Sequence, residues 1–499
     1  MKTQYLVTKI NSQITQPEIN WEKLTKEISK KVGEKKASYQ FKIKPGYPEI
    51  PPSIQLRDYQ EEAIISWFKN NGRGTLKMAT GSGKTITALA IATKLYQKIN
   101  LKVLLVVCPY CHLVKQWERE CEKFNLQPIL AFENVNNWQS LLSNQLYNIL
   151  AGTQPFLTVI TTNSTLITES FQSQLPYFPQ KTLIVGDEAH NLGAPKVEES
   201  LPRFIGLRLA LSATPERYLD EAGTDSLFNY FGEVLQPEFT LGDAIKKGAL
   251  VHYEYYPILV QLTEAEAKTY ARLTKRIGWA LHGNSPKKEM GNEDILTSLL
   301  MQRSRLIGAA ANKLIALHKL MVNRLHTSHT LFYCGDGCVS NGGEINRQVE
   351  AVTRILGKEL GYRVNTYTAE TPLKEREEMR QQFETGQLQG LVAIRCLDEG
   401  VDIPAIENAV ILASSTNPRQ FIQRRGRILR PHPGKEKATL FDMLVMPPNL
   451  DRDTWEVERA LLRKELNRLM EFANLADNAD NACNKLLTLQ EKYCLYGTV

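Results

Sequence analysis

The sequence predicts an α/β protein with two parallel sheets in tandem, a helical basic insertion between them and a helical C-terminal tail. Short apolar runs rich in β-branched residues alternate with helix-length stretches, which is typical of parallel strands joined by crossover helices. The runs form two groups, at roughly residues 50–245 and 315–450. The chain has 499 residues, 42% of them hydrophobic, and is too long for one hydrophobic core, so each group should form its own sheet.

The expected strands can be read from these runs in order. The first group is KVLLVV, FLTVITT, TLIVG and LRLALSA, and the second is TLFYC, RVNTYT, GLVAI, NAVILA and ATLFDML. Continuous apolar runs of this length favour strands that are covered on both faces. We divide the chain into an N-terminal accessory segment, a first sheet domain, a bridge with the helical basic insertion, a second sheet domain and the tail, at residues 1–50, 51–248, 249–325, 326–450 and 451–499.

Charge and cysteine content indicate which partner and which cellular compartment to expect. The formal net charge of +7 is a modest excess that favours an anionic partner. Residues 268–330 hold eleven basic and three acidic residues, which fits either a solvated basic face or a nucleic-acid contact. The eight cysteines show no disulfide framework, the N-terminus lacks the apolar core of a signal peptide, and no apolar run reaches membrane-spanning length. We therefore expect a cytoplasmic protein with no membrane partner.

The stretch MATGSGKT, residues 78–85, predicts a phosphate-binding loop that opens a helix. Its glycines let backbone N–H groups face a phosphate, Lys84 would reach the β and γ phosphates of ATP, and Thr85 would supply a ligand to Mg²⁺. Met78 stands where the usual pattern has its first glycine, but the phosphate-contacting end is intact. The expected ATP-binding residues of the loop are Thr80, Gly81, Ser82, Gly83, Lys84 and Thr85.

An acidic pair follows the strand TLIVG. Asp187 comes directly after this strand, at the carboxyl edge where open α/β sheets bind ligands, and it is the expected second ligand of Mg²⁺. Glu188 is placed to orient and deprotonate the attacking water, which would turn ATP binding into hydrolysis.

With these residues in view, the chain resembles a superfamily 2 helicase of the DEAH type. The matching stretches are LRDYQ at 56–60, MATGSGKT at 78–85, DEAH at 187–190, SATP at 212–215, DEGVDIP at 398–404 and QRRGRILRP at 423–431. GRILRP, with Leu429 where many helicases have glycine, is similar to the branch of double-strand DNA translocases, repair helicases and type III restriction-like motor subunits. The resemblance implies two RecA-like domains that use ATP and Mg²⁺.

The resemblance also implies roles for individual residues. Arg427 and Arg430 would stabilise charge on the departing γ-phosphate when the domains close. The residues that would couple the nucleotide state to the nucleic-acid track are His190, Ser212 and Thr214. Further nucleotide-contacting positions are Arg57, Gln60, Gly400, Asp402, Gln423 and Arg424.

The expected function is therefore that of an ATP-dependent DNA helicase or translocase in phage restriction or DNA repair. Single- or double-stranded DNA is the expected partner. An RNA-remodelling helicase is one alternative, because such motors grip phosphates rather than bases. An ATP-gated scaffold without processive movement is another. We find no carboxylate pair with a following lysine that would mark a nuclease, so cleavage would need a nuclease or defence-system partner.

The spacing CPYC suggests a second kind of chemistry, that of a reactive thiol pair or a metal site. Cys108 and Cys111 end a strand and begin a helix, where a redox-active dithiol could form, or they could join Cys334 and Cys338 in a zinc site. The same stretch matches motif Ia of the helicases through Pro109, Leu113, Gln116 and Trp117. We interpret the cysteines as incidental to that motif.

Overall fold

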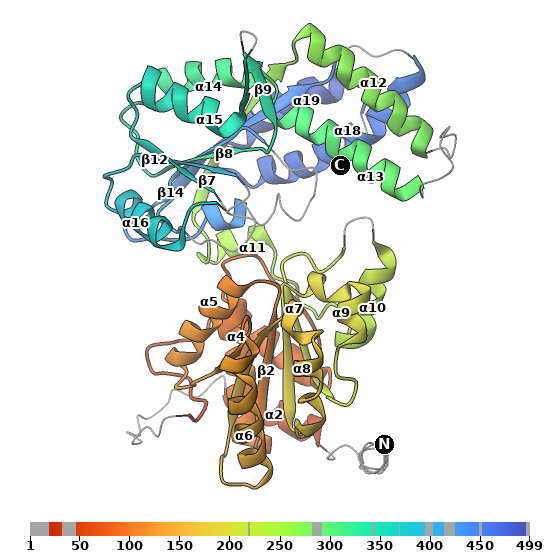
Figure 1. Cartoon of the computed structure of the whole chain (residues 1–499), viewed down its shortest axis with the longest axis vertical. Helices are drawn as coiled ribbons and strands as arrows, with labels where there is room; N and C mark the ends of the chain where they lie inside the picture. The colour runs from red at the N-terminus through yellow and green to blue at the C-terminus, as the bar shows by residue number, and fades with distance from the viewer. Residues whose placement is uncertain are drawn as a thin grey trace. The chain divides into compact units, whose positions relative to one another are not determined.

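Two parallel sheets with helices on their faces organise the chain, as the computed structural model in Figure 1 shows. The structure describes residues 19–31, 46–217, 220–281, 292–341, 344–368, 370–394, 403–413, 425–448 and 452–495. The chain divides into two units, Met1–Ala244 and Ile245–Val499, and the described residues of each form a six-stranded parallel sheet. This confirms the predicted tandem of α/β sheets.

Within its described residues, the first unit holds a six-stranded parallel sheet of order β1-β6-β5-β2-β4-β3. Four strands are buried along their whole length, which is why their sequences are continuous apolar runs rather than alternating ones. The strands are β1 Arg73–Lys77, β2 Val103–Cys108, β3 Ile129–Ala131, β4 Leu157–Thr162, β5 Thr182–Asp187 and β6 Leu207–Ser212.

Helices cover the first sheet and join its strands (Figure 1). The N-terminal segment contributes α2, whose Trp21 ring meets Trp67 of α3 edge to face, with centroids 6.4 Å apart. The helices are α2 Trp21–Lys31, α3 Asp58–Lys69, α4 Lys84–Ile99, α5 Cys111–Lys123, α6 Gln139–Leu150, α7 Asn163–Leu166, α8 Glu169–Gln172, α9 Pro195–Glu199, α10 Glu221–Phe231 and α11 Leu241–Lys246.

In its described residues the second unit holds another six-stranded parallel sheet, of order β11-β12-β8-β13-β14-β7. A short antiparallel hairpin, β9 Cys338–Asn341 with β10 Glu344–Arg347, follows β8. The strands of the sheet are β7 His252–Gln261, β8 Thr330–Cys334, β11 Val364–Tyr367, β12 Gly390–Ile394, β13 Asn408–Ile411 and β14 Lys437–Met446.

One strand differs from the sequence-based division of the chain. Residues 252–261 fall within the expected bridge at 249–325, but they form β7, which pairs with β14 over ten residues at the edge of the second sheet. Buried and less buried side chains alternate through most of β7, as expected for an edge strand. The apolar residues of this strand are interrupted rather than continuous, which is why its sequence resembles a connecting segment.

The helical insertion and the C-terminal tail pack on each other (Figure 1). Arg303 of α13 forms a buried ion pair with Glu458 of α18 at 3.1 Å, and the Tyr270 hydroxyl of α12 donates to the same carboxylate at 2.6 Å. The helices of this unit are α12 Glu264–Leu281, α13 Asn292–Gly308, α14 Asn312–Val322, α15 Gln348–Arg354, α16 Leu373–Glu384, α18 Arg452–Asn474 and α19 Ala479–Lys492.

Two basic residues of the insertion do not belong to a solvated basic face. Arg303 is paired inside the unit, and Lys313 is 1% exposed with its ammonium donating to the Leu412 carbonyl. The other described basic residues of the insertion fit either a solvated basic face or a nucleic-acid contact. Among the residues that the structure describes, no helix is long and apolar enough to cross a membrane.

Candidate nucleotide-binding site

The predicted phosphate-binding loop lies at the carboxyl end of β1 and leads into α4. Gly81 and Gly83 both have φ of +84°, in the left-handed region that favours glycine. A Cβ atom on Gly83 would stand 2.6 Å from the Gln60 side-chain nitrogen, so close packing as well as backbone conformation requires glycine there. Position 78 does not need glycine. The Met78 side chain is accommodated in the core at the strand end, and its N–H donates to the Ser212 carbonyl at 3.0 Å. The departure from the usual pattern thus leaves the loop intact.

Side chains of the loop fit an anionic ligand. The Lys84 ammonium lies across the loop and donates to the carbonyls of Met78 at 3.2 Å and Ala79 at 3.4 Å. The Thr80 and Ser82 hydroxyls are buried and have no hydrogen-bond partner among the described residues. Buried hydroxyls without partners are costly, so a ligand with several acceptor oxygens, such as a triphosphate, suits this loop.

The first turn of α3 packs directly against the loop. Gln60 donates to the Gly83 carbonyl at 3.2 Å and accepts from the Arg57 N–H at 3.0 Å, while the Tyr59 hydroxyl donates to the Ser82 carbonyl at 2.8 Å. Tyr59 also stacks on Phe239, with ring centroids 3.8 Å apart, and burial raises the pKa of its phenol. The predicted base-contacting residues Arg57 and Gln60 therefore adjoin the phosphate loop. The contribution of Tyr59 was missed in the sequence.

The acidic pair lies near the loop because strands β1, β6 and β5 are neighbours. Asp187, the last residue of β5, accepts from the indole N–H of Trp117 at 2.8 Å and from the Glu188 N–H at 2.9 Å. These two donors fix the orientation of the carboxylate. Trp117 matched motif Ia in the sequence but had no assigned role. The sequence feature that could have identified it is its place on the helix after β2. Because β2 pairs in parallel with β5, that helix begins beside the carboxyl end of β5.

Glu188 has an unusual backbone. Its φ and ψ are +44° and 52°, in the left-handed region where non-glycine residues are strained by about 1–3 kcal/mol. The strain is located at the residue expected to activate water. Such a conformation aims a side chain away from the regular strand direction, and it is a common feature of functional sites.

The three predicted coupling residues form one network. His190 Nδ1 lies 3.4 Å from the Ser212 hydroxyl and 3.6 Å from a Glu188 carboxylate oxygen, and Ser212 accepts from the Thr214 N–H at 3.1 Å. Arg217, which the sequence analysis did not identify, donates to the His190 carbonyl. Glu188 is therefore linked through His190 to β6 and the loop that follows it.

The cysteines lack the features of a dithiol or zinc centre. Burial raises the pKa of both Cys108 and Cys111, and the Asp187 carboxylate raises that of Cys108 further. A redox-active thiol needs a lowered pKa. No cluster of three or more metal-binding side chains occurs among the described residues. The raised pKa values favour the interpretation of Cys108 and Cys111 as incidental over that of a reactive dithiol.

The predicted residues of the second unit are only partly described. Gly400, Asp402, Gln423 and Arg424 lie outside the described residues. Arg427 belongs to a helical turn at residues 425–428, and Arg430 follows it. Arg425 begins the turn and forms a buried ion pair with Asp442 of β14. The motif VI arginines are thus carried on a segment that is anchored to the second sheet.

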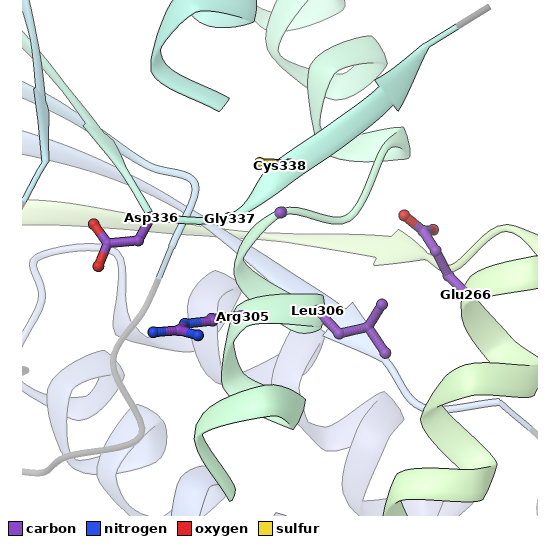
Figure 2. Close-up of a pocket in the computed structure, with 7 residues that line it drawn as sticks. Glu266, Arg305, Leu306, Asp336, Gly337 and Cys338 are labelled. Atoms are coloured by element: carbon purple, nitrogen blue, oxygen red, sulfur yellow. The ribbon is translucent and has the colours of Figure 1, made fainter. Parts of the chain in front are cut away.

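A pocket of about 490 Å³ lies elsewhere in the second unit, between α12, α13 and the segment after β8 (Figure 2). Glu266 at its wall is already engaged, since its carboxylate accepts from the N–H groups of Ala311 and Thr263, each at 2.9 Å. No predicted nucleotide-binding residue lines this pocket. Its labelled lining residues are Glu266, Arg305, Leu306, Asp336, Gly337 and Cys338.

Comparisons with known proteins match both sheet domains. Residues 53–217 match the family described as type III restriction enzyme, res subunit, and residues 313–432 match the helicase conserved C-terminal domain. The chain is 28% identical over 424 residues to DNA 3'-5' translocase XPB2 of Sulfurisphaera tokodaii, covering 81% of this chain and 84% of the relative.

More distant similarities agree with this result. A putative DNA 3'-5' helicase Rad25 of Haloarcula marismortui is 23% identical, and the match covers 77% of this chain but about half, 52%, of that relative. The solved structure of the ATP-dependent type ISP restriction-modification enzyme LlaBIII bound to DNA superposes with a TM-score of 0.55 at 18% identity. It covers 88% of this chain and 33% of that enzyme, so this likeness shows the fold alone.

Proposed function

Since the chain belongs to the superfamily 2 helicases, we propose that it is an ATP-driven motor that moves along DNA. ATP-dependent DNA helicase or translocase function is supported by both matched domains and by the relatives named as XPB and Rad25 proteins. We further propose that DNA stimulates hydrolysis and that the products are ADP and phosphate.

One observation supports this function most strongly. The phosphate-binding loop, the acidic pair and the coupling network occupy neighbouring carboxyl ends of β1, β6 and β5. Lys84 and the loop N–H groups would bind the phosphates, and Thr85 with Asp187 would hold Mg²⁺. The bound ion would neutralise charge on the β and γ phosphates. Glu188 would accept a proton from the attacking water, and His190 would transmit the state of the site to Ser212.

Motif VI would complete hydrolysis from the second unit. Arg427 and Arg430 are proposed to stabilise the charge that develops on the γ-phosphoryl group, which arginine does well because its guanidinium is always protonated. An ATPase that is completed by two units becomes dependent on their closure. We infer that closure and opening pull the DNA, and that any DNA cleavage is performed by a separate nuclease partner.

The rate of ATP hydrolysis with different polynucleotides tests this proposal. Turnover should rise at least several-fold with single- or double-stranded DNA and should be abolished by Lys84→Ala, which removes the principal phosphate cation. Stimulation by RNA alone would indicate an RNA-remodelling motor. ATP hydrolysis that no polynucleotide changes would contradict a nucleic-acid motor of either kind.

A further inference from the structure

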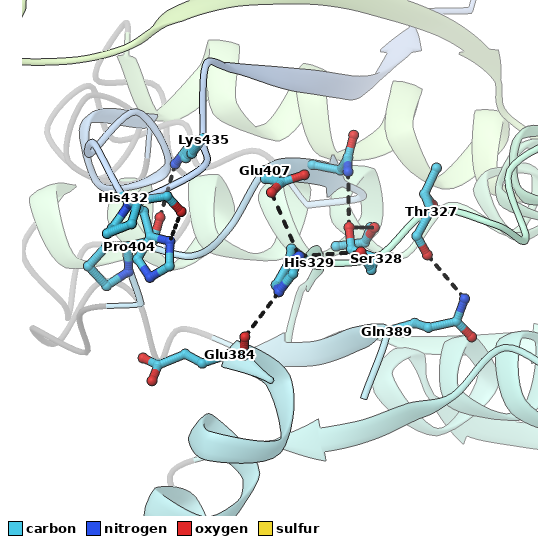
Figure 3. Close-up of polar contacts among 12 residues, drawn as sticks. Thr327, Ser328, His329, Glu384, Gln389, Pro404, Glu407, His432 and Lys435 are labelled. Carbon is cyan, nitrogen blue, oxygen red and sulfur yellow. Dashed lines mark hydrogen bonds and ion pairs between the residues drawn. The ribbon is translucent and has the colours of Figure 1, made fainter. Parts of the chain in front are cut away.

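A buried lysine without an assigned role lies at the end of the motif VI segment. Lys435 is 7% exposed, and its ammonium donates to the carbonyls of Ile428 at 2.6 Å, Arg430 at 2.9 Å and Pro404 at 3.1 Å. Figure 3 shows Lys435 beside Pro404, the residue that ends motif V. An ammonium has three protons to donate, and three carbonyls of the described residues accept them.

These contacts bind carbonyls where the helical turn ends. The carbonyls at the end of a helical segment have no partner within it, and a cation there is favourable because the carbonyl dipoles point toward it. Lys435 binds the carbonyls of Ile428 and Arg430, and the Val251 N–H binds the Leu429 carbonyl between them at 2.8 Å. The three successive carbonyls of residues 428–430 are therefore hydrogen-bonded to other parts of the second unit.

The other end of the segment is fixed as well. Arg425 pairs with Asp442 inside the unit, and the Tyr255 hydroxyl donates to the same carboxylate at 3.0 Å. The Arg425 guanidinium also lies 5.1 Å from the ring of Phe472 on α18, so the C-terminal tail contacts this anchor. Arg427 lies between the two anchors, and Arg430 belongs to the second of them, so the backbone of both residues is held.

We propose that Lys435 is a positioning residue for Arg430 of motif VI, because it binds the Arg430 backbone and joins it to the end of motif V. This inference rests on the proposed role of Arg430 in ATP hydrolysis. Burying a lysine is costly unless its charge is fully hydrogen-bonded. Lys437, two positions further along the chain, is by contrast exposed and pairs with Glu254 at 2.6 Å on the protein surface. A displacement of about 1 Å in a group that contacts the reacting phosphate can slow a reaction about a hundredfold.

A double-mutant cycle with a matched control tests the inference. ATP turnover and the dissociation constant of ATP are measured with saturating duplex DNA for Lys435→Met, Lys437→Met, Arg430→Ala and the double variant Lys435→Met with Arg430→Ala. We expect Lys437→Met to turn over within twofold of the unaltered chain. Lys435→Met should turn over about ten- to a hundredfold more slowly with ATP affinity changed less than threefold, and it should add no further loss to Arg430→Ala.

Two results would overturn the inference. One is turnover by Lys435→Met equal to that of Lys437→Met while Arg430→Ala is impaired. The other is an equal loss from Lys435→Met with and without Arg430, which would show a structural effect that does not act through that arginine. Normal turnover by Arg430→Ala would instead contradict the proposed role of motif VI itself.

Loss of folding by Lys435→Met would not end the test. Lys435→Arg keeps the positive charge, but its planar group cannot meet three converging carbonyls as an ammonium does. In the same cycle we expect a smaller loss of turnover, about tenfold, that is again absent beside Arg430→Ala. Turnover by Lys435→Arg within twofold of Lys437→Met would overturn the inference.

Discussion

The hydrogen bond from Trp117 to Asp187 should set how tightly the site holds Mg²⁺. Trp117 is 1% exposed, and its indole N–H donates to the Asp187 carboxylate at 2.8 Å. Trp117→Phe keeps most of the buried ring and removes the donor. A hydrogen bond to a charged group contributes about 1.5–3 kcal/mol, and a partner that orients a metal ligand typically changes metal affinity about ten- to a hundredfold.

The assay measures ATP hydrolysis with saturating duplex DNA as the Mg²⁺ concentration is varied. We expect Trp117→Phe to need about ten- to a hundredfold more Mg²⁺ for half-maximal turnover, and excess Mg²⁺ should restore much of the rate. Trp67→Phe is the matched control, because Trp67 is equally buried and its N–H donates to the Arg208 carbonyl at 3.1 Å. That variant should lose about 1 kcal/mol of stability and keep its Mg²⁺ dependence. Equal Mg²⁺ midpoints for the two variants would refute the role of Trp117.

Three other variants test separate parts of the account. Glu188→Gln should still bind ATP but hydrolyse it at least a hundredfold more slowly. With ATP present it should dissociate slowly from DNA, which filter binding measures. Rapid release from DNA would count against the role of Glu188 in activating water. Cys108→Ser with Cys111→Ser should keep ATP turnover within twofold, and loss of bound zinc or of disulfide exchange would show that the cysteines do have a function. Burial lowers the pKa of Lys313 to about 8 from its ordinary 10.5, so the folded chain binds fewer protons than the unfolded chain between these values. The free energy of unfolding should therefore rise with pH in that window, and urea titrations of Lys313→Met should show a smaller rise; an identical rise would contradict this assignment.

The parts of the site that depend on local chemistry could be predicted from the sequence. The roles proposed for the loop glycines and Lys84 depend on backbone conformation and charge over a few residues, so their spacing carries the signal. Asp187 was predictable because a continuous apolar run marks the buried strand before it. β7 was not, because an edge strand alternates and resembles a connecting segment.

Contacts between distant segments could not be predicted in the same way. Trp117 reaches Asp187 across 70 positions, and Lys435 reaches Pro404 across 31. Neither pair has a spacing that identifies it. The charge count of the insertion also misled in part, because composition does not tell that Arg303 and Lys313 point inward. Residues that position others therefore needed the structure, whereas residues expected to touch the nucleotide did not.

Displacement of the third strand from a DNA triplex measures directly whether ATP hydrolysis drives this protein along DNA, as proposed. We predict that the unaltered chain displaces the third strand only when ATP is hydrolysed, with a delay that lengthens as the duplex leading to the triplex is extended. Lys84→Ala should displace none. DNA-stimulated ATP hydrolysis without displacement, on triplexes and on forked duplexes alike, would contradict this proposal and indicate an ATP-gated scaffold.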